Sequence, residues 1–283
     1  MDFSKIDEND SATEGTDFRP EPPDMVAGRV LHADADFYAY MCGYRWEEES
    51  LEASYKALRQ TIHTARIMAG AEFIKLYLTM GDKGGRYEIA KVKEYQGKRE
   101  NAPGLDARVS ELRHWMANCS DSEVFPAVFT DQEADDGICQ AMWEAVKTAS
   151  VLQNPMWSMD KDLYMAPGLH MNPVTYELEM YPEGFGECYL DESTSQKKVV
   201  GKGTSFFWHQ MLMGDSADGI PGLPKFSADI CERLWPTKAL LIAEKRIRTA
   251  KTTKAKVAAK AAVRKQRDSI KPKLAGPVKA FDY

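Results

Sequence analysis

Hydrophobic and polar residues along the chain follow two different periods. Short apolar runs typical of buried strands alternate with longer segments whose apolar residues recur every three to four positions. The strand-like runs are Arg29–Ala33, Phe73–Met80, Val124–Thr130 and Pro155–Met159. The helix-like segments between them include Leu51–Met68 and Asp131–Ser150. In the second of these, Ile138, Met142 and Ala145 fall on one face.

Alternation of strands and helices predicts an α/β domain with a parallel central sheet and helices on both faces. We expect this domain to span residues 25–205. No internal repeat interrupts the pattern.

Acidic residues follow each predicted strand. The first run leads into Asp34 and Asp36, and the second leads through Gly81 into Asp82. The remaining acids after strands are Asp131, Glu133, Asp135, Asp136, Asp160 and Asp162. The carboxyl ends of parallel strands meet at one edge, where α/β proteins bind ligands, so we expect these side chains to share a crevice.

So many carboxylates in one crevice repel each other unless cations neutralise them. Hard divalent cations prefer oxygen ligands, so the pattern suggests Mg²⁺ or Mn²⁺, and two such ions can hold a scissile phosphate. A competing interpretation is that each acid only caps the helix that follows it.

A Gly/Pro-rich segment, Gly214–Lys225, carries two more carboxylates, Asp215 and Asp218. A helix is expected to follow it over Phe226–Trp235. A glycine-rich hairpin between helices presents backbone amides to a phosphodiester, although a plain interhelical turn has the same composition. We therefore predict an α-helical, helix-hairpin-helix-type DNA-binding subdomain over residues 206–237.

The formal net charge of the 283 residues is −6, but the two signs are separated. Residues 238–279 contain 14 Lys and Arg and two acids, a charge of +12, which leaves −18 for the rest. We expect residues 238–283 to form a basic helical tail that is either solvated or binds phosphates. Residues 1–24 hold eight acids and three prolines and are expected to be a disordered arm.

The cysteines and the N-terminus point to a reducing compartment. The five cysteines are widely spaced and form no CxxC pair, which makes a disulfide framework unlikely. The chain starts with an acidic segment rather than a basic one and has no apolar run long enough to span a membrane. We expect a cytoplasmic protein, in the host cytoplasm if it is encoded by a phage.

Taken together, these residues resemble the 5′-nuclease (flap endonuclease) family, and most closely phage-type 5′→3′ exonucleases and the nuclease domain of bacterial DNA polymerase I. The resemblance runs from about Arg29 to Trp235 and rests on an Asp after the first strand, GDKGGR at 81–86, EADD at 133–136, DKD at 160–162 and GDSADGIPG at 214–222. It implies a PIN/5′-nuclease-like fold and hydrolysis of DNA by a two-metal mechanism.

The resemblance also implies roles for individual residues. The first metal would take Asp34, Asp82, Glu133 and Asp135, with Asp136 near both ions, and the second would take Asp160, Asp162, Asp215 and Asp218. Arg86 would face the scissile phosphate, and Asp36 would lie outside the ligand set. At the hairpin, Gly219, Ile220, Gly222 and Lys225 would contact DNA and K⁺ could bind.

The sequence departs from the family in two places. Where the family has Tyr-Lys-x-x-Arg, this chain has Tyr95-Gln96-Gly97-Lys98-Arg99, with Gln96 in place of the lysine, so Lys98 or Arg99 would replace the missing cation beside Tyr95. The hairpin lacks the second Gly-x-Gly after Gly222. Residues 97–123 fall where the family has its arch, and Arg108 and Arg113 there would bind a single strand or form part of an ordinary surface hairpin.

The leading hypothesis is therefore a metal-dependent 5′→3′ exonuclease or flap endonuclease. We expect it to be a monomer that acts on DNA, and on RNA–DNA hybrids as a further substrate, in phage replication or recombination. One alternative is a haloacid-dehalogenase-like phosphatase, whose nucleophile and metal motifs are also similar to Asp34-Ala35-Asp36 and to the segment from Gly214 to Asp218. A second alternative is a non-catalytic DNA-binding protein whose acids cap helices.

Overall fold

The computed structural model describes residues 21–45, 50–81, 85–89, 107–191, 198–215, 218–223, 235–249, 256–257, 260–261 and 263–264. Most of the predicted acidic arm and several predicted site residues lie outside these ranges. The predicted site residues outside them are Asp82, Tyr95, Lys98, Arg99 and Lys225.

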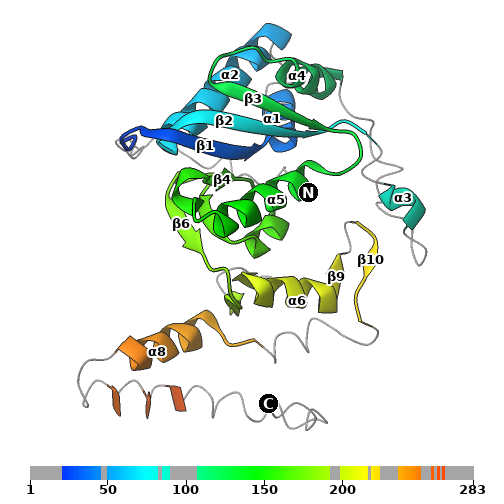
Figure 1. The fold of residues 1–283 in the computed structure, drawn as a ribbon. Helices are drawn as coiled ribbons and strands as arrows, with labels where there is room; N and C mark the ends of the chain where they lie inside the picture. Colours follow the sequence, from blue (N-terminus) through cyan, green and yellow to red (C-terminus); the bar gives the residue numbers. More distant parts are fainter. Residues whose placement is uncertain are drawn as a thin grey trace, which may run out of the picture.

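The centre of the molecule is a six-stranded sheet in the order β3-β2-β1-β4-β5-β6 (Figure 1). Its strands are β1 (Val26–Asp34), β2 (Ala71–Thr79), β3 (Val124–Phe129), β4 (Met156–Trp157), β5 (Gly168–Met171) and β6 (Leu178–Tyr181). Strands β1 to β5 are parallel, and β6 pairs antiparallel with β5. The four strands predicted from apolar runs are confirmed, and they are the ones whose carboxyl ends carry the acids.

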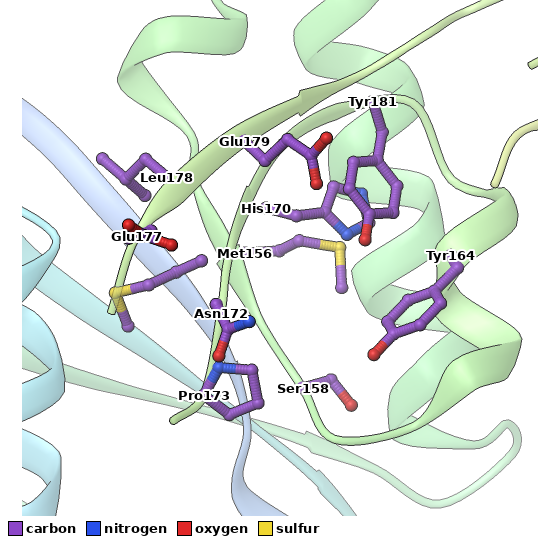
Figure 2. A pocket seen from close by; sticks show the side chains of 11 residues that line it. Met156, Ser158, Tyr164, His170, Asn172, Pro173, Glu177, Leu178, Glu179 and Tyr181 are labelled. Atoms are coloured by element: carbon purple, nitrogen blue, oxygen red, sulfur yellow. The ribbon is translucent and has the colours of Figure 1, made fainter. Parts of the chain in front are cut away.

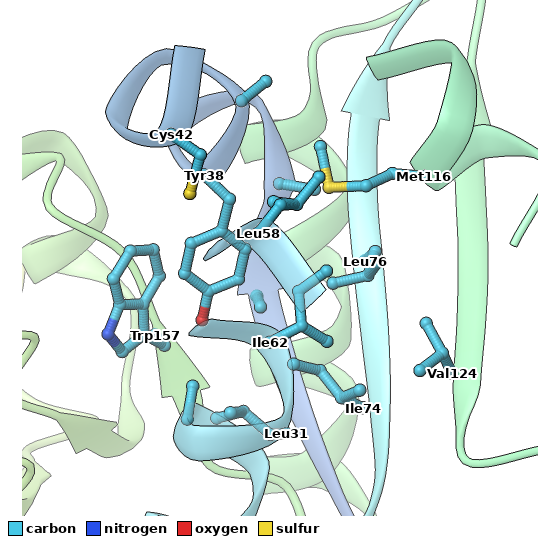
Figure 3. Close-up of a cluster of buried hydrophobic side chains, with 14 of the residues drawn as sticks. Leu31, Tyr38, Cys42, Leu58, Ile62, Ile74, Leu76, Met116, Val124 and Trp157 are labelled. Atoms are coloured by element: carbon cyan, nitrogen blue, oxygen red, sulfur yellow. The ribbon is translucent and has the colours of Figure 1, made fainter. Parts of the chain in front are cut away.

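Helices cover both faces of this sheet, as predicted. On one face lie α1 (Ala35–Arg45), α2 (Leu51–Met68) and α4 (Ala107–Ala117). Their apolar side chains pack with Leu31, Leu76 and Trp157 in one core cluster (Figure 3). The other face is covered by α5 (Ala134–Lys147), where Ile138 and Met142 pack against Tyr77 and Met156.

Helix α2 illustrates why these segments fold as they do. Ser50 accepts a hydrogen bond from the Ala53 amide at 3.1 Å and so caps the first turn. Leu58 and Ile62, four residues apart, are almost fully buried on one face. Burying each such side chain stabilises the fold by about 1.5–3 kcal/mol.

The chain leaves the sheet through smaller elements. The helical turns η3 (Val151–Gln153) and η4 (Lys161–Met165) flank β4, and α3 (Arg86–Ile89) follows β2. A hairpin of β7 (Glu187–Asp191) and β8 (Lys198–Lys202) precedes α6 (Thr204–Met213). After α6 come the short antiparallel pair β9 (Gly214–Asp215) and β10 (Ile220–Pro221), and then α8 (Lys238–Thr249).

The part of the predicted arch that the structure describes lies within the core. In α4, Val109, Leu112 and Met116 are fully buried, and the helix packs on α1. Residues 107–117 therefore form one layer of the α/β domain, and an arch would have to be built by the residues before them.

The predicted second helix of the hairpin subdomain falls almost wholly outside the described residues. Its first helix is α6, and the hairpin itself is β9–β10. Within the segment predicted to be a basic tail, the structure has the helix α8. Among the described helices, none is both long and apolar enough to cross a membrane.

Candidate metal centre

The parallel strands bring three acidic segments to one edge of the sheet. Asp34 is the last residue of β1, and Asp135 lies in the first turn of α5, the helix that follows β3. Asp160 lies three residues beyond the end of β4, which pairs with β1. The charges of these three carboxylates act on one another, so they lie near one another at this edge, which is called the acidic crevice below.

Asp34 lies deepest in this crevice, with 8% of its surface exposed. It accepts hydrogen bonds from the Ser158 hydroxyl at 3.0 Å and the Phe37 amide at 3.2 Å. Burial, and next the charge of Asp36, raise the pKa of Asp34 to about 7. The carboxyl group therefore needs a cation in order to stay fully ionised at neutral pH.

Asp135 lies close to Asp34 and Asp160. Burial, followed by the charges of Asp34 and Asp160, raises its pKa well above the ordinary value. Among the described residues, no cation or hydrogen-bond donor contacts this carboxylate. Protein interiors rarely leave such a group unpaired, and sites that do are candidates for function.

Glu133 and Asp136 lie beside Asp135 at the start of α5 and are bridged by an arginine. Asp136 accepts a hydrogen bond from the Glu133 amide at 3.2 Å, which caps the helix. The guanidinium of Arg86 forms ion pairs with Glu133 and, at 2.8 Å, with Asp136. Arg86 thus holds these two acids in place without a metal.

A second acidic group continues from Asp160 towards the hairpin. Asp160 accepts from the Asp162 amide at 2.8 Å, and burial, together with the charges of Asp162 and Asp218, raises its pKa. Asp215 accepts from the Asp218 amide at 3.3 Å. The four residues predicted to hold the second metal therefore lie near one another in space.

Two side chains that sequence reasoning missed lie on this second group. Lys161 is 2.8 Å from Asp162 and 3.5 Å from Asp215, and Gln210 of α6 donates to Asp162. Ser158, which bonds Asp34, was missed as well. Lys161 could have been identified from its position between two aspartates, but Gln210 and Ser158 carry no signal in the sequence.

Within the described ranges, no three His, Cys, Asp or Glu side chains are close enough together to hold one ion. Arg86 and Lys161 draw four of the acids towards themselves, and Asp82 lies outside those ranges. The donor set nevertheless fits a hard divalent cation, because it consists of carboxylates and leaves Asp135 unneutralised.

Helix capping, the competing interpretation, accounts for several of the acids. Asp34 accepts from the first turn of α1, Asp136 from the start of α5, and Asp160 from the start of η4. Asp135 is different, because within the described ranges it accepts from no backbone amide and the charges that act on it are those of other carboxylates. Capping alone therefore does not explain the crevice.

Asp36 is held away from the ligand positions. One of its oxygens accepts the Thr79 amide at 3.0 Å, and the other lies 3.0 Å from Arg113 Nε. A haloacid-dehalogenase-like phosphatase would need this carboxyl group free to exchange a proton with substrate. The observed contacts argue against that alternative.

The two arginines predicted to bind DNA from the arch point into the fold. Arg113 is 17% exposed and pairs with Asp36, and Arg108 donates to the Ser54 hydroxyl at 3.4 Å. Their guanidinium groups join α4 to its neighbours in this structure.

At the predicted hairpin, the backbone at Gly214 and Gly222 lies directly against other backbone atoms. A Cβ atom at Gly222 would overlap the Met213 carbonyl group, and one at Gly214 would overlap the Gly222 amide. Gly219 has a positive φ of 75°, which favours glycine. Ile220 is 52% exposed, so the tip of the hairpin faces outwards from α6.

A cavity of about 510 Å³ adjoins the crevice. Figure 2 shows His170, Tyr164 and Tyr181 along one side of it and Ser158 at its lower end. Since the Ser158 hydroxyl donates to Asp34, the cavity and the acidic crevice share this residue.

No protein-family model matches the chain, and no curated protein is significantly similar to it in sequence. Solved structures of similar fold do exist. One is a variant of the bacteriophage T5 flap endonuclease in a pseudo-enzyme–product complex with DNA and metal ions, with 15% identity, a TM-score of 0.52, and coverage of 85% of this chain and 87% of that chain. Another is the T5 5′-exonuclease with bound zinc, with 16% identity, a TM-score of 0.52, and coverage of 86% and 88%.

At this level of identity the likeness establishes the fold. The arrangement of strands and helices is that of these T5 nucleases over most of both chains, which confirms the fold expected from the sequence.

Proposed function

We propose that this protein is a divalent-metal-dependent 5′-nuclease that hydrolyses phosphodiester bonds in DNA. The observation that carries the proposal is Asp135, a carboxylate grouped with Asp34 and Asp160 at the carboxyl edge of the sheet, with no cation paired to it among the residues that the structure describes. The shared fold supports it, because the T5 proteins of that fold are nucleases solved with metal ions and DNA.

We infer two metal positions from the two acidic groups. The first would be held by Asp34, Asp82, Glu133 and Asp135, with Asp136 between the positions, and the second by Asp160, Asp162, Asp215 and Asp218. Oxygen-only ligands favour Mg²⁺ or Mn²⁺. A pair of such ions supplies charge that stabilises the attacking and leaving oxygens of a phosphodiester.

Side chains of the chain itself would orient and neutralise the phosphate. Arg86 bonds Glu133 and Asp136, and a metal that takes over these carboxylates frees its guanidinium to donate to a phosphate oxygen. Lys98 or Arg99 would add positive charge beside the phosphate, next to Tyr95. All three residues lie outside the described ranges. Asp34 would be kept in its rotamer by the Ser158 hydroxyl.

DNA beyond the crevice would be held by backbone amides and by the basic C-terminal segment. The hairpin would offer the amides of Gly219, Ile220 and Gly222, next to Lys225, and K⁺ would bind at the same hairpin. Arg246 and Arg248 of α8 are exposed and would bind phosphates without regard to sequence. The substrates would be 5′ ends of duplexes, flaps and RNA–DNA hybrids. The protein would act as a monomer, in the replication or recombination of a phage in the host cytoplasm.

The test uses two duplexes that carry a label at either the 5′ or the 3′ end, each incubated with the chelator-treated protein. With Mg²⁺ or Mn²⁺ restored, we expect short labelled products from the 5′-labelled duplex early in the reaction and a gradually shortened strand from the 3′-labelled one. Asp160→Asn should abolish both. Cleavage that persists in chelator, or that releases short products first from the 3′ end, would contradict the proposal.

A further inference from the structure

Thr79, the last residue of β2, uses all three of its polar groups to join separate elements. Its amide donates to Asp36 of α1 at 3.0 Å, and its carbonyl accepts from Arg113 of α4. Its hydroxyl accepts from the amide of Ala134, the first residue of α5, at 2.9 Å. Thr79 is 8% exposed, so these contacts are shielded from water.

Arg113 and Asp36 complete this network with a partly buried ion pair. Arg113 Nε lies 3.0 Å from Asp36 Oδ1, and both atoms are inaccessible to solvent. The charge of Arg113 opposes the effect of burial on Asp36 and favours its ionised form. Arg113 therefore contacts both the carboxylate and the strand end to which that carboxylate bonds.

Two members of the network lie close in the chain to residues of the acidic crevice. Asp36 is two residues from Asp34, and Ala134 directly precedes Asp135. Moving the end of β2 would therefore move α1 and α5 relative to each other, and with them the two carboxylates.

We propose that Arg113 is a positioning residue for the metal centre, which fixes the spacing of Asp34 and Asp135 through Asp36 and Thr79. This inference rests on the proposed function, since it concerns the same crevice. Buried partners around metal ligands typically contribute 10–100-fold to metal affinity.

A second effect acts in the same direction. The charge of Asp36 already acts unfavourably on Asp34 and Asp135. If Arg113 is removed, Asp36 becomes a buried carboxylate without its counter-ion, free to turn towards its acidic neighbours. Removing the charge of Asp36 as well should then restore part of the metal affinity that is lost with Arg113.

The experiment measures Mn²⁺ binding to chelator-treated, full-length protein by calorimetry, without DNA, together with thermal unfolding in chelator. The variants are Arg113→Gln, Arg113→Lys, Asp36→Asn and the double variant Arg113→Gln/Asp36→Asn. Arg66→Gln is the matched control, because Arg66 also donates to β2 carbonyls, at Ala71 and Glu72, but at the opposite end of the strand.

We expect Arg113→Gln to weaken Mn²⁺ binding by about 10–100-fold and Arg113→Lys to weaken it less. The double variant should bind more tightly than Arg113→Gln. Asp36→Asn should bind nearly as well as the unaltered protein, because the amide oxygen still accepts from Thr79. Arg66→Gln should lower the unfolding temperature without changing Mn²⁺ affinity.

Equal Mn²⁺ affinity in Arg113→Gln and Arg66→Gln would overturn the inference, as would a double variant no better than Arg113→Gln. If Arg113→Gln fails to fold, the same comparison applies between Arg113→Lys and Arg66→Lys. An unaltered protein that binds no Mn²⁺ would contradict the proposed function itself, which separates the two failures.

Discussion

Asp135 is the residue on which the metal assignment most depends. Its neighbours each have a second role as a helix cap or an ion-pair partner, whereas the contacts of Asp135 are with other carboxylates. A residue that lowers the stability of the free protein in this way is typical of a site selected for function rather than for folding.

Asp135→Asn should therefore have opposite effects on metal binding and on stability. We expect Mn²⁺ affinity to fall by more than about 100-fold, because a ligand contributes at least as much as an outer partner. In chelator at neutral pH, the unfolding free energy should rise, since a carboxyl group whose pKa is raised by folding destabilises the folded protein at that pH.

Calorimetry and thermal unfolding measure the two effects. Asp131→Asn, an exposed acid in the same loop, is the control and should change neither quantity. An Asp135→Asn variant that is less stable than the unaltered protein in chelator would show that Asp135 has a favourable partner in the free protein.

His170 gives a pH-dependent prediction at the same scale. Its ring is 6% exposed, stacks on Tyr181 with centroids 3.8 Å apart, and donates from Nε2 to the Ala166 carbonyl at 2.8 Å. Burial lowers the pKa of His170 to about 4. Between its unfolded value of about 6.5 and 4, the unfolded chain binds a proton that the folded protein does not, so stability falls as the pH falls.

We expect this residue to cost up to about 3 kcal/mol of unfolding free energy between pH 6.5 and pH 4. Denaturant unfolding of His170→Gln should show a correspondingly shallower loss over this range. His114→Gln, which alters an exposed histidine of α4, should follow the unaltered protein. Parallel curves for all three proteins would contradict the prediction.

Among the elements, the strands that carry the site were predictable and the later ones were not. The runs that become β1 and β2 are mostly apolar, and residues 31–34 and 76–79 at their carboxyl ends are buried, as expected for central strands of a parallel sheet. Strand β6, Leu178–Tyr181, is a four-residue strand at the edge of the sheet, and its two middle residues are exposed. The β7–β8 hairpin is not part of the main sheet. Such short segments gain their stability from tertiary contacts that no local pattern records.

The site was predictable to the same extent. The acids could be placed at one edge because topology alone brings strand ends together. The ion pairs of Arg86, Arg113 and Lys161 join residues that lie far apart in the chain or on different elements, so their partners could not be read from spacing. Arg113 was expected at a DNA-binding surface and instead pairs with Asp36, because α4 packs against α1.

The β9–β10 hairpin yields a prediction for an element. Gly222→Ala would force the hairpin away from the end of α6, where Leu223 now donates to the Leu212 carbonyl at 2.9 Å. We expect a loss of about 1–3 kcal/mol of stability, typical of overpacking, and weaker DNA binding. Mn²⁺ binding at Asp34 and Asp135 should be retained.

Fluorescence anisotropy with labelled duplex and thermal unfolding check this prediction. Gly184→Ala is the matched control, because a Cβ atom there meets no atom within 4 Å. Equal DNA affinity in the two variants would exclude the hairpin from the DNA-binding surface.

At the scale of the whole molecule, the distribution of charge matters more than its sum. The net charge of −6 hides a C-terminal stretch of +12 and a remainder of −18. Helix α8 lies at the start of the basic stretch. Its Lys245 forms an ion pair of 2.6 Å with Glu187 of the β7–β8 hairpin. It is therefore held to the folded part of the protein while its arginines stay exposed.

Arg246→Gln combined with Arg248→Gln should weaken DNA binding and reduce its dependence on salt. Each lost phosphate contact lowers the slope of log affinity against log salt by about 1, so the double variant should lose about 2. Lys56→Gln with Arg59→Gln removes two exposed cations from α2 and should leave the slope unchanged. An unaltered slope in the α8 variant would exclude this helix from the DNA interface.

The most direct test of the central claim is a single-turnover cleavage assay on 5′-labelled duplex DNA with saturating Mn²⁺, comparing Asp135→Asn with Asp131→Asn. We predict that Asp131→Asn cleaves at the rate of the unaltered protein and that Asp135→Asn is inactive although folded. Equal cleavage by the two variants would show that the acidic crevice is not where the phosphodiester bond is broken.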